Sequence, residues 1–260
     1  WPTEVQPGET TTLVGMSEYT AQNLLDMMDT LLRGLPLVFY TSGGPASGSG
    51  DIIGGIVTMS APDDTVMSVL SALGQSLTEL RLVCGNLTNI RVNPLRSLAN
   101  LYVDGSAESL PEAFAVNGVM SHVVVTAPLT SIGASAFQSC TALTGITLPD
   151  SLTSISDYAF NQCGLTSIRI PNSVTSIGAS AFEMDQALTS VELGDAVETI
   201  GSSAFVGGAY SAMDIPSSVV SIGSNAFITW ADSLVVTCRA TTPPTMTGNA
   251  FRDDGSVSSI

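Results

Sequence analysis

The chain has 260 residues, enough for one long domain or two ordinary ones, and a chain of this size buries a substantial core. Its net charge is −16 and its seven basic residues, all arginine, form no run, so we expect it to bind neither nucleic acid nor an anionic membrane surface. Its apolar runs are too short to span a bilayer, and because it begins at Trp1 with no signal-peptide pattern, we expect a processed or truncated start.

Residues 1–76 lack the regularity of the rest of the chain, and we expect them to form a helical cap or an anchoring segment. Apolar residues recur at helical spacing within residues 16–34, which end in a glycine, and residues 64–77 predict a second helix. The Gly- and Ser-rich residues 41–50 predict a flexible loop, and residues 52–59 predict a strand. We expect the first helix to cover the end of the region that follows, because an uncovered end exposes a strand edge.

The region from residue 77 to 260 repeats one short sequence motif, in which an Ala-Phe pair recurs every 22 to 24 residues. The phenylalanines of these pairs are Phe114, Phe137, Phe160, Phe182, Phe205, Phe227 and Phe251. Such a period is typical of a solenoid, in which each coil is too small to bury its own apolar face and stacks on its neighbours. We therefore expect the rings of consecutive coils to form one continuous stack.

Each repeat also contains two short extended patterns. The first, L-x-x-I-x-I, occurs for example as Leu165, Ile168 and Ile170, and its alternation is typical of a strand with one buried face. The second, V-x-x-I, follows as Val174 and Ile177 in the same repeat. Proline followed by Asp, Asn or Ser separates the two patterns in most repeats, which predicts a turn between two strands on every coil.

Degenerate copies of the first pattern extend back to Leu77, and the last repeat ends near Phe251. We therefore expect roughly eight coils. With strands about 4.8 Å apart, these coils form an arc about 35–40 Å long. Leu234 and Val236 compete for one strand position in the last coil, and the sequence leaves that register open.

Outward side chains of neighbouring strands should align in two rows across the concave sheet, because side chains alternate along each strand. One row contains Arg81, Tyr102, Val124, Thr147, Arg169, Glu192 and Asp214, and the other contains Glu79, Asn100, His122, Gly145, Ser167, Ser190 and Ala212. The candidate ligand-binding residues within these rows are Arg81, Tyr102, His122, Arg169, Glu192 and Asp214. They give a graded polar strip suited to a protein or a glycan, and the alternative is that they are ordinary solvated strand residues.

Reactive side chains are few and scattered. Cys140 and Cys163 lie one coil apart, so their Cα atoms should be about 5 Å from each other, within disulfide range; we favour the alternative of two buried thiols. His122 is the only histidine and no GxSxG, HExxH or phosphate-loop motif occurs, so we predict no catalytic residues. The acidic pairs at 63–64 and 253–254 lack the alternating oxygen ligands of a calcium loop, so we predict no metal site and no cofactor.

The repeated motif SVTSIGASAFxxxxxLTSIxIP closely resembles the repeat of the BspA-like class of bacterial leucine-rich-repeat surface proteins. The resemblance covers residues 110–251 well, residues 77–109 loosely and residues 1–76 not at all, and the closing TCRATTPPTMTGNAF looks like the last repeats of that class. It implies a right-handed leucine-rich-repeat solenoid, an extracellular location and adhesion to ligands on a host or neighbouring cell. The class brings no catalytic residues.

We therefore predict a leucine-rich-repeat solenoid over residues 77–260, mostly β with short turns or helices, behind an N-terminal helical cap. The leading function is that of a secreted or cell-surface binding protein without catalysis, which contacts a protein or glycan through its concave face. The rival is a structural subunit of a virion or extracellular assembly, anchored by residues 1–76. A homo-oligomer formed through the solenoid end or through residues 1–76 is an associated expectation.

Overall fold

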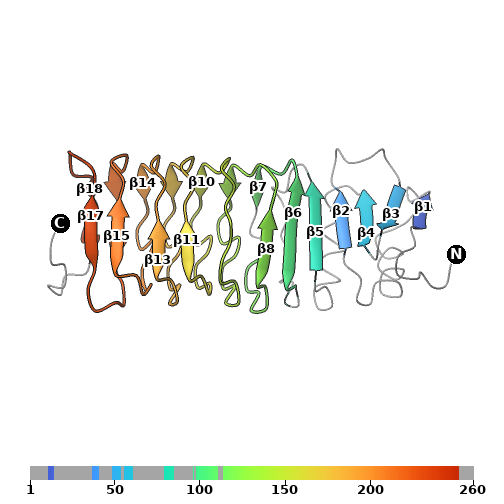
Figure 1. The fold of residues 1–260 in the computed structure, drawn as a ribbon, viewed down its shortest axis with the longest axis horizontal. Helices are drawn as coiled ribbons and strands as arrows, with labels where there is room; N and C mark the ends of the chain where they lie inside the picture. The colour runs from blue at the N-terminus through green and yellow to red at the C-terminus, as the bar shows by residue number, and fades with distance from the viewer. Residues whose placement is uncertain are drawn as a thin grey trace.

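The computed structural model describes residues 11–14, 37–40, 49–53, 56–60, 79–84, 96, 98–110 and 114–251, with side chains described for Leu80 and from residue 96 onward. From residue 79 onward, the described residues form an elongated β-solenoid whose coils follow one another along its long axis (Figure 1). From Phe114 to Phe251 the solenoid makes about six turns. The roughly eight expected coils reach back to Leu77, and before residue 96 the structure describes strands alone.

Two sets of parallel strands make the two walls of the solenoid. The longer strands are β5 (Glu79–Cys84), β6 (Asn100–Gly105), β8 (His122–Val125), β11 (Ser167–Arg169), β13 (Ser190–Glu192), β15 (Ala212–Ile215) and β17 (Val235–Cys238). The shorter strands are β7 (Ser109–Leu110), β9 (Ser131–Ile132), β10 (Ser154–Ile155), β12 (Ser176–Ile177), β14 (Thr199–Ile200), β16 (Ser221–Ile222) and β18 (Thr245–Met246). Both predicted strand patterns are confirmed, and the structure describes no helix within these residues.

The two walls differ in continuity. The seven shorter strands form one uninterrupted parallel sheet in the order β18-β16-β14-β12-β10-β9-β7. The longer strands divide into the group that ends at β8, the pair β11-β13 and the pair β15-β17. In the last pair Met213 aligns with Val236, which settles the open register, and Leu234 is buried as well.

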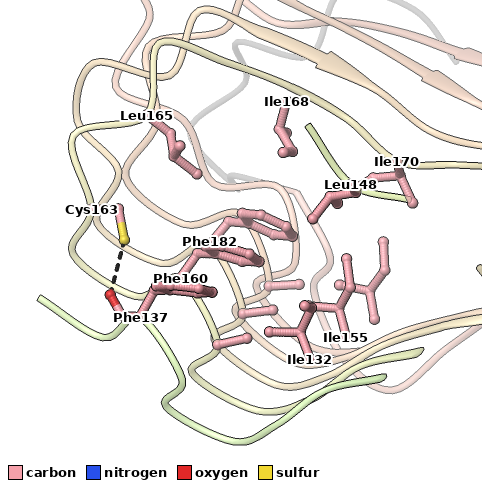
Figure 2. Packing of buried hydrophobic residues seen from close by; sticks show 14 of the residues in the cluster. Ile132, Phe137, Leu148, Ile155, Phe160, Cys163, Leu165, Ile168, Ile170 and Phe182 are labelled. Carbon is pink, nitrogen blue, oxygen red and sulfur yellow. Dashed lines mark hydrogen bonds between the residues drawn. The ribbon is translucent and has the colours of Figure 1, made fainter. Parts of the chain in front are cut away.

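The expected stack of rings is confirmed. Ring centroids of consecutive ladder phenylalanines lie 5.1 to 5.9 Å apart, and their planes are within 18° of parallel. These distances are those of offset stacking, and the six rings from Phe114 to Phe227 are almost completely buried. Figure 2 shows Phe160 and Phe182 stacked between Leu148, Ile168 and Ile170 on one side and Ile132 and Ile155 on the other. Each ring therefore fills the space between the two walls of its coil.

The turns that carry these rings have an unusual backbone. Around most rings, residues two before and two after the ring adopt left-handed φ although nearly all of them are not glycine, as at Ser135 (53°) and Ser139 (60°) around Phe137. The N–H groups of Ser135, Phe137 and Ser139 all donate to carbonyl oxygens of the next coil, at 3.0, 2.8 and 2.7 Å. Left-handed residues of this kind cost on the order of 1 kcal/mol each, and the bonds between coils offset that cost.

The N-terminal strands do not continue the solenoid in chain order. They are β1 (Thr11–Val14), β2 (Leu37–Tyr40), β3 (Ser49–Ile53) and β4 (Ile56–Ser60), and the sheet runs β1-β3-β4-β2-β5-β6-β8. The single strand expected over residues 52–59 is wrong, because β3 and β4 are two antiparallel strands, and β3 takes the last two residues of the expected loop at 41–50. Residues 54 and 55 are both glycine, which suits a tight reversal.

Several expectations lie outside the described residues or stay untested. The helices expected at residues 16–34 and 64–77 lie outside the described residues, so the helical cap stays a prediction, as does the right-handed coil. The division of the chain at residue 76 also stays a prediction, although β2 pairs in parallel with β5 across it.

Candidate ligand-binding face

The outward side of the longer strands is the face on which the sequence places its candidate binding residues. We call it the long-strand face, and its fully described outward residues are Tyr102, His122, Thr147, Arg169, Glu192, Asp214, Val235 and Thr237 together with the small residues between them. Where strands pair, the predicted rows are confirmed: Arg81 aligns with Tyr102, and Arg169 aligns with Glu192. No strand pairing joins Val124 to Thr147 or Glu192 to Asp214. The concave shape expected of this face stays a prediction.

Two rings meet at the N-terminal part of the long-strand face. Tyr102 and His122 lie in adjacent strands, diagonally across the β6-β8 pair, and their ring centroids are 5.8 Å apart in an edge-to-face arrangement of 68°. Diagonal neighbours on one face of a sheet are within reach of long side chains. His122 is exposed, so this pair presents an aromatic edge and an imidazole to solvent.

Opposite charges meet further along the same face. The Nε atom of Arg169 lies 3.9 Å from Oε2 of Glu192, and both side chains are largely exposed, so water screens their attraction. Both groups therefore stay available to a ligand.

A tighter ionic cluster lies near the C-terminal end, and the sequence reading did not identify its central residue as a site residue. Nε of Arg239 donates to Oδ1 of Asp214 at 3.0 Å, and Nη1 donates to Oδ1 of Asp195 at 3.0 Å. The guanidinium thus joins carboxylates from two preceding coils to its own. The repeat could have indicated this cluster. Thr237 lies beside Asp214 in the outward row, and Arg239 follows Thr237 two residues later along the same coil.

The candidate residues therefore form three separate groups along the face rather than one cluster. Tyr102 and His122 form the first, Arg169 and Glu192 the second, and Asp214 with Arg239 the third. Arg81 aligns with the first group by register. An elongated ligand is needed to touch more than one of these groups at once.

A hollow of about 550 Å³ opens on the face between the first and second groups. It is lined by Ile146, Thr147, Leu148, Pro149, Asp150, Arg169 and Pro171. Leu148 is buried and Ile146 is half-buried, so the floor is apolar, whereas Asp150 and Arg169 supply opposite charges at the rim. It is the one place on the long-strand face where the sheet is open on both sides of a coil, between β8 and β11.

A column of buried polar groups runs on the far side of the ladder, three residues after each of the first four rings, at Asn117, Cys140, Cys163 and Asp185. Cys140 and Cys163 are separate thiols, which agrees with the favoured alternative, and their Sγ–H groups donate to the carbonyl oxygens of Phe114 and Phe137 at 3.2 and 3.1 Å. Figure 2 shows the second of these bonds. Burial raises the pKa of the Cys140 thiol to about 12, so this group stays protonated and is a poor nucleophile.

Asp185 continues this column as a fully buried carboxyl group. Its Oδ1 accepts a hydrogen bond from the N–H of Cys163 at 2.6 Å, whereas Oδ2 has no partner. Burial raises the pKa of Asp185 to about 8, and the bond from Cys163 opposes that rise. The group is sealed inside the solenoid and faces no ligand.

Neither a metal centre nor a membrane span emerges from the part of the chain that the structure describes. No three His, Cys, Asp or Glu side chains there are placed to hold a metal ion together. No helix among the same residues has the length and apolar character needed to cross a bilayer.

The repeats match a known family. Residues 110–231 match the BspA type leucine rich repeat region in six copies. The fold is similar to a leucine-rich repeat protein from Bacteroides ovatus, with 22% identity and a TM-score of 0.55, over 67% of this chain and 51% of that one. This chain thus spans about half the length of that protein, and the likeness shows the fold alone.

A second solved structure is more distant. A leucine rich cell surface protein from Faecalibacterium prausnitzii is similar with 20% identity and a TM-score of 0.44, over 78% of this chain and 69% of that one. No curated protein matches the chain significantly.

Proposed function

Because residues 110–231 form a BspA-type leucine-rich-repeat region, we propose that the chain belongs to a cell-surface or secreted protein that binds a protein or glycan through its long-strand face. The extracellular location and the adhesive role rest on the nature of this repeat. The proposal assigns ligand contact to Tyr102, His122, Arg169, Glu192 and Asp214, with Arg81 beside them, and it adds Arg239.

The observation that carries this proposal is that the inward and outward residues of each coil have different surroundings. Inward residues of the longer strands are buried against the ring ladder, whereas their outward neighbours, such as Arg169 and Glu192, are exposed and make one weak ion pair. Since the backbone register fixes the spacing of these outward groups, the face presents polar side chains in a rigid array without a folding cost. Such an array suits recognition of an extended partner.

Binding without catalysis also agrees with the chemistry of the reactive groups. The thiols of Cys140 and Cys163 and the carboxyl group of Asp185 are buried away from the face, and His122 lies beside an aromatic ring rather than a nucleophile. A general base or nucleophile has to reach a bound substrate within hydrogen-bond distance. The described face offers no such pair.

The experiment is a binding screen of the purified 260-residue chain on a glycan array and on a panel of immobilised extracellular proteins. We expect at least one saturable partner, and we expect the double variant Arg169→Ser and Glu192→Ser to bind it about tenfold more weakly, because its central charged pair is lost. The double variant leaves the net charge unchanged, so a general electrostatic effect does not produce this result.

The matched control is the double variant Arg96→Ser and Glu108→Ser, which also removes one exposed charge of each sign but lies off the long-strand face. It should bind within about twofold of the unmodified chain. Equal weakening by both double variants, or by neither, would show that the long-strand face is not the contact surface.

A further inference from the structure

The last coil of the solenoid leaves part of its inner face uncovered. Met246 stands beside Ile222 in the register of β16 and β18, yet Met246 is 46% exposed whereas Ile222 is completely buried. Phe251 is half-buried, although the six ladder rings before it are almost fully buried. An inward side chain of a solenoid is covered by the next coil. The exposure of these two side chains therefore marks an end that no described residue covers.

Both strands of this coil are also edges, and they lie at one end of the solenoid (Figure 1). Among the described residues, β18 pairs with β16 alone and β17 pairs with β15 alone. The N–H groups of Thr245 and Thr247 donate to the preceding coil at 2.9 and 3.1 Å, so the opposite side of β18 is a free edge. An apolar surface beside a free strand edge invites pairing with another segment, and natural proteins cover such edges.

The sequence that follows Phe251 contains a copy of the shorter-strand motif. Residues 256–260 are SVSSI, and the motif is SVTSI at residues 173–177 and SVVSI at residues 218–222. In both earlier copies the Val and the Ile are buried, and the last two residues form β12 or β16. The turn residues Asp and Gly at 254–255 precede the new copy, where Pro-Asn or Pro-Ser precedes the earlier ones. The same pattern therefore occurs once more, directly after the uncovered coil.

We propose that residues 252–260 close the C-terminal end of the solenoid by lying along the free edge of β18. Val257 and Ile260 have the spacing of the two buried residues in each shorter-strand motif, so they cover Met246 and Phe251 as a further coil does elsewhere. This closure is separate from ligand binding by the long-strand face.

The segment is long enough to reach its place. Residues 252–256 connect the last ring to the motif, and five extended residues span at most about 17 Å. A Val-x-x-Ile motif in a strand is about 10 Å long. The connection therefore returns from the ring across the end of the core to either end of β18. Its sequence, RDDGS, is polar, which suits a connection that faces water.

A segment of the same chain is favoured over a second copy as the occupant of this end. A second copy brings another −16 charges, whose repulsion opposes association at low salt. A segment joined through a short connection has an effective concentration in the millimolar range, which a separate molecule at micromolar concentration does not reach.

The first test is amide hydrogen exchange of the full 260-residue chain. Val257→Asp places a charge in the apolar contact, so we expect exchange of the Thr247 amide, in the last coil, to become about tenfold faster. Ser258→Asp adds the same charge one residue later, at the position of the exposed Thr175 in the motif, and should change this rate by less than about twofold. Far-UV circular dichroism verifies that both variants are folded.

The second test detects the contact directly. With ¹³C-labelled methyl groups, we expect nuclear Overhauser effects between the methyl group of Met246 and those of Val257 or Ile260. A mixture of labelled and unlabelled chains distinguishes contacts within one chain from contacts between two copies, because only the latter give effects across the isotope filter.

Two results would overturn the inference. One is equal exchange of the Thr247 amide in Val257→Asp and Ser258→Asp, since the apolar side chain then contributes nothing to the closure. The other is an absence of these Overhauser effects, or their appearance only between copies, which assigns the end of the solenoid to solvent or to a second molecule.

Discussion

At the scale of single residues, Asp185 has the most unfavourable surroundings among the described side chains. It is fully buried, Oδ2 lacks a partner, and burial raises its pKa from 3.8 to about 8. Asn117 occupies the equivalent place three coils earlier and shows how an amide satisfies it. Its Nδ2 donates to the Leu98 oxygen at 2.9 Å, and its Oδ1 accepts from the Met120 N–H at 2.8 Å.

The raised pKa of Asp185 makes the stability of the solenoid depend on pH. The folded chain holds this proton where the unfolded chain has lost it, so the stabilisation is complete below about pH 4 and is lost as the pH rises through about 8. The Asp185→Asn variant keeps a neutral donor at all pH values. We expect its gain in unfolding free energy over the unmodified chain to be larger at about pH 9 than at about pH 5, by about 4 kcal/mol.

Urea unfolding at the two pH values measures this difference. Glu198→Gln is the control, because Glu198 is exposed and its substitution should shift stability equally at both pH values. An Asp185→Asn variant whose gain is independent of pH would show that the buried group ionises normally.

Some residue-level features were predictable from the sequence and others were not. The two buried thiols were predicted correctly, since a small apolar residue fits a repeated interior position. The ion cluster of Arg239 was missed, because its partners lie one and two coils away and the choice of rotamer decides which carboxylate a long side chain reaches. Gly145 did carry a signal, since glycine within a strand pattern marks a weak or open strand.

At the scale of elements, the ring ladder connects coils that have little stability alone. Phe182 is fully buried, with Phe160 and Phe205 stacked on its two faces at 5.3 and 5.1 Å. Phe251 is half-buried and stacks on Phe227 at 5.4 Å. The interior ring therefore supports two interfaces between coils and a larger buried area than the last ring.

Truncation of an interior ring should cost much more than truncation of the last one. We expect Phe182→Ala to lower the unfolding free energy by about 3–5 kcal/mol and Phe251→Ala by less than about 2 kcal/mol. Phe182→Leu, which keeps most of the volume, provides a folded intermediate case at about 1–2 kcal/mol. Chemical denaturation measures all three, and equal losses at the two positions would mean that the stack does not carry the stability of the solenoid.

The elements differ in how far the sequence could predict them. The ring stack and parallel register follow from the period alone, because equal spacing along the chain becomes equal height along the solenoid. The left-handed turns were not predicted, since residues such as Tyr158 and Met184 avoid that conformation unless bonds to the next coil impose it. The sheet order β1-β3-β4-β2-β5 was also unpredictable, because pairing between distant strands leaves no period in the sequence.

At the scale of the whole molecule, shape and charge act together. The described coils extend along one axis with an uninterrupted sheet on one wall and a divided sheet on the other (Figure 1). The net charge of −16 repels a second copy at low salt and attracts basic partners, so the electrostatic field favours binding to others over self-association. This balance separates the proposed binding function from the rival role as a subunit of an assembly.

We expect the 260-residue chain to remain a monomer of 26.7 kDa at micromolar concentrations. Light scattering coupled to size exclusion is the appropriate measurement, because an elongated solenoid elutes earlier than a globular protein of equal mass and elution volume alone would mimic a dimer. The run is repeated at about 0.02 M and about 0.3 M salt, since screening of the −16 charge at the higher value weakens the repulsion between copies. A constant monomer mass favours the surface binding protein, whereas a fixed oligomer at both salt concentrations requires an interface strong enough to overcome that repulsion and supports the assembly subunit instead.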